Sequence, residues 1–403
     1  MWAWLTYLSI DHGNSTYALH RYTQAGNAPS VFAGSPEWSS LTRAGKVPAK
    51  DQEAAGNFSE MITQLIEKVA RRQDLDRAEM ASALDALIEG VCPEAQMAGL
   101  LIGLRVKGEA PEELVGAAVA LRARAVKLPL AQQPMLDTCG TGGDGSGSLN
   151  LSTMAAFIAA GAGVTVAKHY NRSASSLCGS ADVLESLGAT VEQSPAQTAR
   201  ALETVGIGFL YAPLYHPATR AVAQLRRALS VRTLFNLLGP LTSPAAVKAQ
   251  LVGVFHPDRL VLMASAIREL GRERALVVSA ATGEATGLDE IAPNGVTAIA
   301  ELRGGDIRTF EVTPADFGAP ETPIAAIEGG SPEFNAEGMR AILSGEPHVA
   351  RIAVLINASA ALVAADAAED FRDGYRRAAE AIDSGAALAK LDQFIAQSKV
   401  AVE

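Results

Sequence analysis

The sequence is poor in the residues that build disulfide frameworks and zinc sites. Its 403 residues include three cysteines, Cys92, Cys139 and Cys178, which are far apart and form no CxxC pair. A scattered, odd-numbered set of this kind indicates neither a disulfide scaffold nor a structural zinc site, and it is typical of a reducing compartment. We therefore expect a cytoplasmic protein.

The chain also lacks an excess of positive charge and a long hydrophobic run. Its net charge of −10 argues against a nucleic-acid binder, because affinity for a phosphate backbone requires a basic surface. The opening run MWAWLTYLSI is followed by Asp11 and preceded by no cationic segment, so it is too short for a membrane helix and unlike a signal peptide. A local basic pocket for a small anion remains compatible with this composition.

The overall composition is that of a globular protein, with 48% hydrophobic and 19% charged residues. The length allows one large domain or two modest ones. Residues 1–57 differ from the rest, because they hold all three tryptophans amid Gly, Ser and Pro without sustained periodicity. We interpret them as an N-terminal extension with little regular structure; a docking segment is the alternative.

Residues 58–127 are expected to form a small helical domain. Apolar residues recur at helical spacing in four segments, 58–72, 74–90, 92–108 and 110–126. Asp74 or Asp76 is a candidate N-cap for the second segment, and glycines end the second and third. A later helical segment near 216–240 is expected to pack on this domain.

From residue 128 onward, short apolar runs alternate with helical patterns. Strands are expected at 135–140, 164–168, 189–193, 206–213, 249–255 and 274–280. This alternation predicts an α/β domain over residues 128–403, with a mainly parallel sheet covered by helices on both faces. The fold class is therefore α/β, with a small helical domain and a larger α/β domain.

A glycine-rich loop, GTGGDG at Gly140–Gly145, follows the first of these strands and precedes a helix. A dinucleotide site requires an acidic residue at the end of the next strand, but that strand ends in the cationic, polar run AKHYNR. A Walker A loop would close with G-K-[ST], which is missing. What remains is a loop whose backbone N–H groups converge on an anion at a helix N-terminus.

Polar residues surround this loop in the sequence. Asp144 is an acid inside a predicted anion site, which implies a metal ion or a developing positive charge nearby. Lys168 and Arg172 supply fixed positive charge. Neutral donors and acceptors are supplied by Asn150, Ser152, Thr153, Ser175, Ser176 and Ser180. A purely structural glycine turn would not require so many polar neighbours.

Four motifs in this order resemble the anthranilate phosphoribosyltransferase family. They are GTGGDGSGSLNLST, KHYNRSASSLCGSADVLESLG, YAPLYHPATRAVAQLRRALSVRTLFNLLGPL and GLDEI, and the resemblance covers residues 58–385. It implies a nucleoside-phosphorylase-like fold, a site between the two domains and a homodimer. It also implies that the amine of anthranilate displaces Mg-bound diphosphate from phosphoribosyl pyrophosphate (PRPP), in tryptophan biosynthesis.

The resemblance assigns roles to individual residues. For PRPP it implies Gly140, Gly143, Asp144, Ser148, Asn150, Leu151, Ser152, Thr153, Lys168, His169, Asn171, Arg172, Ser175, Ser176 and Ser180. For anthranilate it implies Gly140, His169, Asn171, His216, Arg226 and Pro240. For two Mg²⁺ ions it implies Ser152, Asp289 and Glu290, whose oxygens suit a hard cation. No nucleophile is expected, because positioning and electrostatics suffice for this reaction.

The chain departs from the family pattern at Tyr170, where KHYNR stands for the usual KHGNR. Either Tyr170 points to solvent from a displaced loop, or its ring fills part of the acceptor pocket and changes the acceptor. Ser230 and Ser243 also replace a common glycine and asparagine, and the segment before GLDEI is long. Three alternatives remain: another aromatic acceptor, a nucleoside phosphorylase, and a non-catalytic, nucleic-acid-binding relative.

Overall fold

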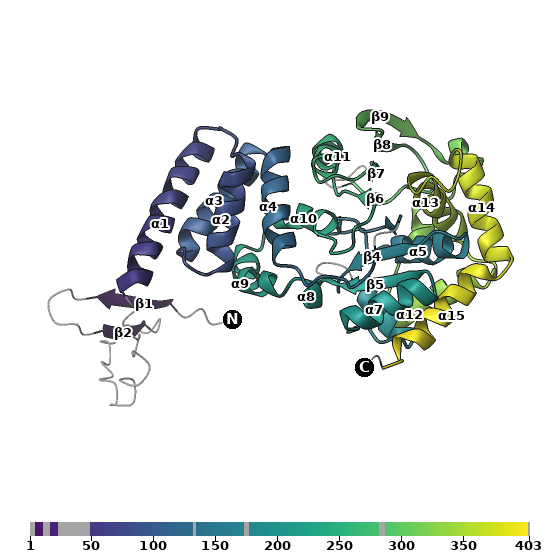
Figure 1. The fold of residues 1–403 in the computed structure, drawn as a ribbon, viewed down its shortest axis with the longest axis horizontal. Helices are drawn as coiled ribbons and strands as arrows, with labels where there is room; N and C mark the ends of the chain where they lie inside the picture. Colours follow the sequence, from purple (N-terminus) through teal and green to yellow (C-terminus); the bar gives the residue numbers. More distant parts are fainter. Residues whose placement is uncertain are drawn as a thin grey trace. The chain divides into compact units, whose positions relative to one another are not determined.

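The computed structural model describes residues 5–10, 17–22, 49–131, 134–172, 177–281 and 287–401 (Figure 1). The chain divides into two compact units, Met1–Ala54 and Ala55–Glu403. In the first unit, β1 (Leu5–Ile10) and β2 (Tyr17–Tyr22) form an antiparallel hairpin, consistent with the strand preference of their Tyr and Thr residues. Parts of the extension, expected to have little regular structure, therefore carry it; the rest lies outside the described residues.

Four helices follow, as predicted: α1 (Ala49–Ala70), α2 (Arg77–Ile88), α3 (Glu94–Lys107) and α4 (Pro111–Ala123). The first begins at Ala49 rather than near residue 58. Asp76, and not Asp74, is the N-cap of α2: its carboxylate accepts hydrogen bonds from two backbone N–H groups of the first turn, completing a capping box with Glu79. Gly108, with φ of +89°, ends α3.

The larger domain is built on a seven-stranded sheet with the order β5-β4-β3-β6-β7-β8-β9. Its strands are β3 (Leu136–Asp137), β4 (Val166–Tyr170), β5 (Ile207–Tyr211), β6 (Ala249–Gly253), β7 (Arg274–Ala280), β8 (Thr297–Arg303) and β9 (Asp306–Val312). The first five in spatial order pair in parallel, whereas β8 and β9 add an antiparallel edge that the sequence did not predict. The prediction of a mainly parallel sheet is confirmed.

The helices of this domain are α5 (Leu151–Gly161), α6 (Ser180–Ser186), α7 (Pro195–Thr204), α8 (Ala212–Tyr215), α9 (Arg220–Leu229), α10 (Phe235–Leu241), α11 (Leu260–Glu269), α12 (Pro332–Leu343), α13 (Arg351–Ala364), α14 (Phe371–Asp383) and α15 (Ala386–Ser398). They cover both faces of the sheet (Figure 1). Along β7, Leu276 and Val278 pack in one core with α5 and α13, whereas Ala275 and Val277 pack in the other with α11. This alternation is the two-residue period of a strand buried on both sides.

The strand predicted at residues 189–193 is wrong. This stretch is a loop between α6 and α7, and Ser194 caps the N-terminus of α7. Its alternation arises because Ala189 and Val191 are buried in the hydrophobic core without a ladder partner. Burial alone therefore produced a strand-like pattern.

Helices α9 and α10 share a core with the helical bundle. Val222 and Leu225 of α9 and Leu238 of α10 are buried in the same cluster as the apolar residues of α1–α4. The chain between β5 and β6 thus joins the bundle to the sheet, and it contains the motif with His216, Arg226 and Pro240. Within the described residues, no helix is both long and apolar enough to cross a bilayer.

Ser230 occupies a conformation that suits glycine. It ends α9 in the left-handed region, with φ of +50° and ψ of +24°. We expect Ser230→Gly to raise the free energy of unfolding by about 0.5–1 kcal/mol, because the Cβ strain disappears while only the weak Ser230 Oγ bond to the Arg227 carbonyl is lost. Urea midpoints would measure this. Ser230→Ala keeps the strain, so a gain of stability in that variant would contradict the explanation.

Candidate functional site

The glycine loop lies between β3 and α5, as predicted. Gly142, Gly143, Gly145 and Gly147 have φ values of +65°, +76°, +78° and +62°. Because L-residues rarely adopt this region, glycine is required for the path of the loop. The loop ends at Asn150, where α5 begins, so its N–H groups lie at a helix N-terminus, which favours an anion.

The acidic pair from the GLDEI motif lies against this loop. The Gly142 N–H donates to Asp289 Oδ2 at 2.8 Å, although the two residues are 147 positions apart. The Asp289 N–H donates to Asp144 Oδ2 at 3.4 Å, and the Ser152 N–H donates to Glu290 Oε1 at 3.2 Å. The structure thus places the predicted metal ligands beside the predicted phosphate loop.

The cluster of acidic side chains beside the glycine loop favours binding of a cation. Burial raises the pKa of Glu290 to about 7, with Lys168 opposing and Asp144 adding to the shift. Burial and the charges of Asp144 and Glu290 hold the pKa of Asp289 well above its usual range. Three carboxyl groups that repel one another, and whose oxygens can act as metal ligands, fit a hard divalent cation such as Mg²⁺.

The protein supplies only part of a coordination shell. Among the described residues, no group of three or more His, Cys, Asp or Glu side chains has metal-binding geometry. Mg²⁺ is commonly held by one or two carboxylates, with the remaining ligands coming from water and substrate phosphates. The residues present therefore fit an ion that arrives with a phosphorylated ligand.

Lys168 supplies the positive charge of this site from β4. Its side chain is only 2% exposed, and Nζ donates to the Thr138 carbonyl at 2.5 Å and to Ser152 Oγ at 3.2 Å. Ser152 therefore contacts Lys168 through its hydroxyl and Glu290 through its N–H. The ammonium group of Lys168 lies beside the first turn of α5, where its positive charge favours a bound anion.

The loop after β4 is tied to the same helix start. Thr153 Oγ1 donates to Ser180 Oγ at 2.9 Å, and Asn150 Nδ2 donates to the Cys178 carbonyl at 3.2 Å. Leu151 is fully buried, so only its backbone could reach a ligand. Ser148 forms an isolated backbone bridge with Glu328.

His169 and His216 form the centre of the predicted acceptor side. Their rings meet edge to face at 5.2 Å between centroids, and His169 Nδ1 lies 3.0 Å from the Gly239 carbonyl. Burial lowers the pKa of His169 to about 3 and that of His216 to about 4, so both are neutral at pH 7. In the described part of the chain, His169 Nε2 has no hydrogen-bond partner, whereas the Thr242 backbone opposes the lowering of the pKa of His216.

Arg226 and Pro240 come from the segment that joins bundle and sheet. The Arg226 guanidinium lies 5.4 Å from the centroid of the Phe235 ring. Burial lowers the pKa of Arg226, with no carboxylate among the described residues opposing the shift. Such a cation suits the carboxylate of a ligand. Pro240 is buried in α10, and its carbonyl accepts a hydrogen bond from Gln250 Nε2.

Some of the residues predicted to bind PRPP do not lie against the glycine loop. Arg172 Nη1 pairs with Asp182 at 2.9 Å and with Glu185 at 2.7 Å, because the carboxylates of α6 attract it. Its predicted role would require these pairs to open. Asn171 is exposed, and its Oδ1 accepts from the Arg172 N–H. Ser175 and Ser176 lie outside the described residues.

Both interpretations of Tyr170 are wrong. Its side chain is 4% exposed, and its hydroxyl donates to the Val191 carbonyl at 2.9 Å. Its ring packs against Phe209 and Tyr211, each 5.5 Å away between centroids. Tyr170 is a strand residue of β4, so it needs no positive φ and points into the core rather than to solvent or the acceptor side.

We expect substitutions of Tyr170 to change stability and not acceptor recognition. Tyr170→Phe removes one of two hydrogen bonds to the Val191 carbonyl, which keeps the Gln193 N–H at 3.0 Å, and should cost about 0.5–1.5 kcal/mol. Tyr170→Gly also leaves a cavity and should cost about 3–5 kcal/mol. Urea denaturation and the acceptor KM of both variants would test this. A raised acceptor KM in a variant that is still folded would place the ring at the acceptor.

Two buried asparagines in the C-terminal helices were missed by the sequence analysis. Asn335 Nδ2 donates to Asn150 Oδ1 at 3.0 Å, which orients the start of α5. Asn357 accepts from the Ile291 N–H and donates to the Ile291 carbonyl, both at 2.9 Å, and so fixes the backbone after Glu290. A buried amide in the apolar helix α13 was the available signal, because it requires partners.

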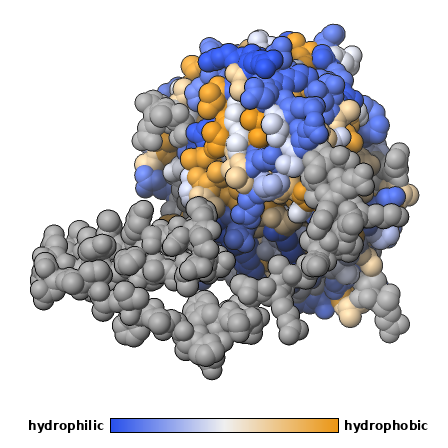
Figure 2. All heavy atoms as spheres, turned by 90° about the vertical axis from the view of Figure 1, so that its left-hand side faces the viewer, coloured by the Kyte–Doolittle hydropathy of each residue, from blue (hydrophilic) through white to orange (hydrophobic). Residues whose placement is uncertain are grey.

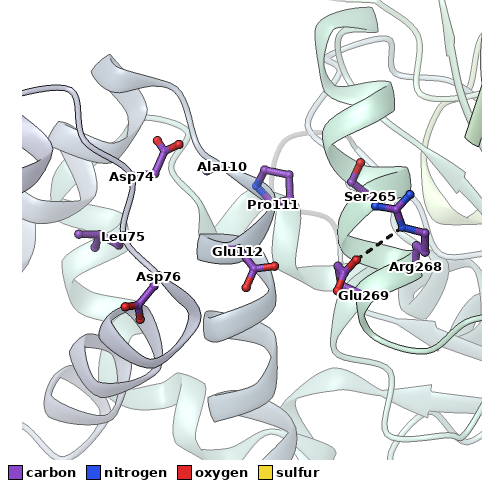
Figure 3. Close-up of a pocket in the computed structure, with 9 residues that line it drawn as sticks. All are labelled: Asp74, Leu75, Asp76, Ala110, Pro111, Glu112, Ser265, Arg268 and Glu269. Atoms are coloured by element: carbon purple, nitrogen blue, oxygen red, sulfur yellow. Dashed lines mark ion pairs between the residues drawn. The ribbon is translucent and has the colours of Figure 1, made fainter.

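A cavity of about 470 Å³ lies elsewhere, where α2 and α4 meet α11 (Figure 3). It is lined by Asp74, Leu75, Asp76, Ala110, Pro111, Glu112, Ser265, Arg268 and Glu269. The ion pair between Arg268 and Glu269 lies at its edge, 3.5 Å between Nε and Oε1. None of the predicted site residues lines this cavity.

Comparison with known proteins assigns the chain to a family. The helical-bundle domain model of the glycosyl transferase family matches residues 63–125, and the a/b domain model matches residues 132–388. The anthranilate phosphoribosyltransferase of Myxococcus xanthus is 48% identical over 335 residues, covering 83% of this chain and 98% of that protein. That of Anaeromyxobacter sp. strain Fw109-5 is 47% identical over 339 residues, covering 84% and 99%.

Solved structures give the same result. Anthranilate phosphoribosyltransferase from Thermus thermophilus superposes with a TM-score of 0.78 at 40% identity, covering 83% of this chain and 99% of its own. The Saccharomyces cerevisiae enzyme in complex with PRPP and Mg has a TM-score of 0.75 at 25% identity, covering 84% and 97%. A variant of it in complex with 4-fluoroanthranilate has 0.73 at 25%, covering 84% and 98%. This chain belongs to the anthranilate phosphoribosyltransferase family.

Proposed function

We propose that this chain transfers the phosphoribosyl group of PRPP to the amine of anthranilate, giving N-(5-phosphoribosyl)anthranilate and diphosphate in tryptophan biosynthesis. The hydrogen bond from the Gly142 N–H to Asp289 carries this proposal, because it unites the glycine loop with the acidic pair. The complexes of the yeast relative with PRPP, Mg and 4-fluoroanthranilate support the choice of donor, metal and acceptor.

The donor diphosphate would lie on the glycine loop at the start of α5. Lys168 would stabilise it from below, and Thr153 and Ser180 would offer hydroxyls. Mg²⁺ held by Ser152, Asp289 and Glu290 would neutralise the departing diphosphate oxygens. We assign two ions to the site, because the carboxyls lie at two places: Asp289 beside Gly142, and Glu290 beside Ser152.

The acceptor would bind between the neutral histidines and Arg226. Arg226 would pair with the acceptor carboxylate, and the uncharged rings of His169 and His216 would face the aromatic ring or its amine. An aromatic amine attacks in its neutral form, so no strong base is required. Catalysis would rest on positioning and on electrostatic stabilisation of the leaving group. Tyr170 points into the core, so it gives no reason for another acceptor.

We further assign residues 58–127, with α9 and α10 packed on them, to the helical domain and residues 128–403 to the α/β domain. The separate matches of the helical-bundle model to residues 63–125 and of the a/b model to residues 132–388 support this division. A cytoplasmic location is supported by three free cysteines, Cys92, Cys139 and Cys178.

A homodimer is the proposed assembly. Apolar side chains form a band on the face of the helical bundle (Figure 2). Phe58 and Ile66 of α1 and Ile102 of α3 are partly exposed, and Val106 of α3 is 71% exposed. Light scattering of the full chain should give twice the 41.9 kDa of one chain, and Val106→Glu should dissociate it. A monomeric wild type would overturn this assignment.

A steady-state assay tests the function directly. Loss of anthranilate fluorescence should show turnover of about 1 per second or faster with PRPP and Mg²⁺. Chelation by EDTA should abolish it. Release of a free base from nucleosides and phosphate, without activity on PRPP, would instead favour a nucleoside phosphorylase.

A further inference from the structure

The glycine loop is anchored at several backbone groups. The Thr141 N–H donates to the Gly253 carbonyl at 2.9 Å, and the Gly329 N–H donates to the Gly147 carbonyl at 2.9 Å. These partners come from the end of β6 and from the segment before α12, so they fix the two ends of the loop to the α/β domain. The centre of the loop is held from a different direction.

At the centre, the Gly143 carbonyl accepts a hydrogen bond from Arg232 Nη2. Arg232 lies in the link between α9 and α10, and its guanidinium lies 4.6 Å from the centroid of the Phe255 ring, which follows β6. This stacking restricts the guanidinium and aims it at the loop. Arg232 was not among the residues that the sequence pointed to.

Arg232 is itself held by the helical bundle. Its carbonyl accepts a hydrogen bond from Arg105 Nη1 of α3. Two and three residues further along the chain, Leu234 and Phe235 are buried in the core that contains α1–α4. A contact chain therefore runs from α3 through Arg105 and Arg232 to the glycine loop.

The planarity of the peptide bond gives this contact a consequence for the donor. The described residues contain no cis peptide bond, so the Gly143 carbonyl and the Asp144 N–H point in opposite directions. By holding the carbonyl, Arg232 directs the Asp144 N–H away from itself. A glycine peptide flips easily, and the flipped form would present a carbonyl oxygen where the N–H stood.

We propose that Arg232 is a positioning residue, which sets the orientation of the Gly143–Asp144 peptide for the donor diphosphate and couples it to the helical bundle through Arg105. The proposal rests on the function proposed above, from which PRPP is taken as the ligand. It assigns a role in donor binding to α3, whose Arg105 contacts the loop only through Arg232 in the described contacts.

A double-mutant cycle tests the coupling. The variants are Arg232→Met, Arg105→Met and the double variant, with Arg220→Met, an exposed residue of α9, as the matched control. Loss of a charged hydrogen bond predicts about tenfold or greater weakening of PRPP binding in Arg232→Met, measured by calorimetry with Mg²⁺. Arg105→Met should weaken PRPP binding less than Arg232→Met does. The double variant should bind PRPP as tightly as Arg232→Met. The acceptor KM should stay within about twofold.

Additive losses in the cycle, or donor affinity unchanged in Arg232→Met, would overturn the proposal. Hydrogen exchange gives a readout that does not depend on any ligand: amides of residues 140–148 should exchange faster in Arg232→Met and unchanged in Arg220→Met. A wild type that binds no PRPP would refute the proposed function, whereas unchanged exchange in Arg232→Met would refute the positioning role. Should Arg232→Met fail to fold, Arg232→Lys, which cannot stack on Phe255, should show an intermediate loss.

Discussion

Asp289→Asn should lower kcat/KM by about 10²–10³-fold, the effect of removing one preorganised electrostatic group from a transition state. Asparagine has the size of aspartate and retains an oxygen that can accept from the Gly142 N–H, now 2.8 Å from Asp289 Oδ2. The loop therefore keeps its anchor while the site loses one of its three carboxyl charges. Because the pKa of Asp289 is held high by burial and by its acidic neighbours, this substitution should not destabilise the fold.

Initial rates measured against Mg²⁺ concentration distinguish this account from simple damage. The half-saturating Mg²⁺ concentration should rise in Asp289→Asn, and excess Mg²⁺ should restore part of the rate. Glu321→Gln, which removes an exposed carboxylate outside the site, is the matched control and should behave as wild type. An unchanged Mg²⁺ dependence in Asp289→Asn would assign the metal to other ligands.

The sequence predicted the parts of the site that follow local rules. The glycine loop was recognisable because a cluster of glycines between a strand and a helix has few explanations other than an anion site. Lys168 and the GLDEI acids were assigned because their motifs occur in the family order, and the structure places both beside the loop. Capping rules, which involve three or four neighbouring residues, placed the start of α2 at Asp74 or Asp76, and the structure selects Asp76.

The parts that could not be predicted depend on residues far apart in the chain. Arg232 reaches a glycine 89 positions away, and Asn357 reaches Ile291 from 66 positions away. No local pattern encodes such contacts. Tyr170 was misinterpreted for the same reason: only the pairing of β4 with β5 shows that its ring packs on Phe209 and Tyr211. Strand preference also misled at residues 189–193, where core burial without a ladder gave the same alternation.

Gly253→Ala should abolish most activity while removing no polar group. A Cβ at Gly253, the last residue of β6, would lie 1.5 Å from the Asp289 carbonyl oxygen and 2.4 Å from its carbonyl carbon. Both are backbone atoms, so no side-chain rotation relieves the collision. The backbone at Asp289 must move away, and the carboxylate that contacts the Gly142 N–H must move with it. We expect at least a roughly 100-fold loss of kcat/KM and a loss of about 1–3 kcal/mol of stability, typical of an overpacked site.

The ratio of these two effects is what identifies Gly253 as part of the site. Gly99→Ala in α3 is the matched control, because its Cβ would make only an ordinary contact of 3.7 Å with Ile66 and alanine favours the helix by up to about 1 kcal/mol. Urea midpoints and Mg²⁺-dependent rates of both variants separate folding from catalysis. If Gly253→Ala lost stability but kept its rate at saturating Mg²⁺, the position of the Asp289 backbone would not limit catalysis. Loss of rate in a folded Gly253→Ala variant would show that the position of the Asp289 backbone requires a residue without a side chain at 253.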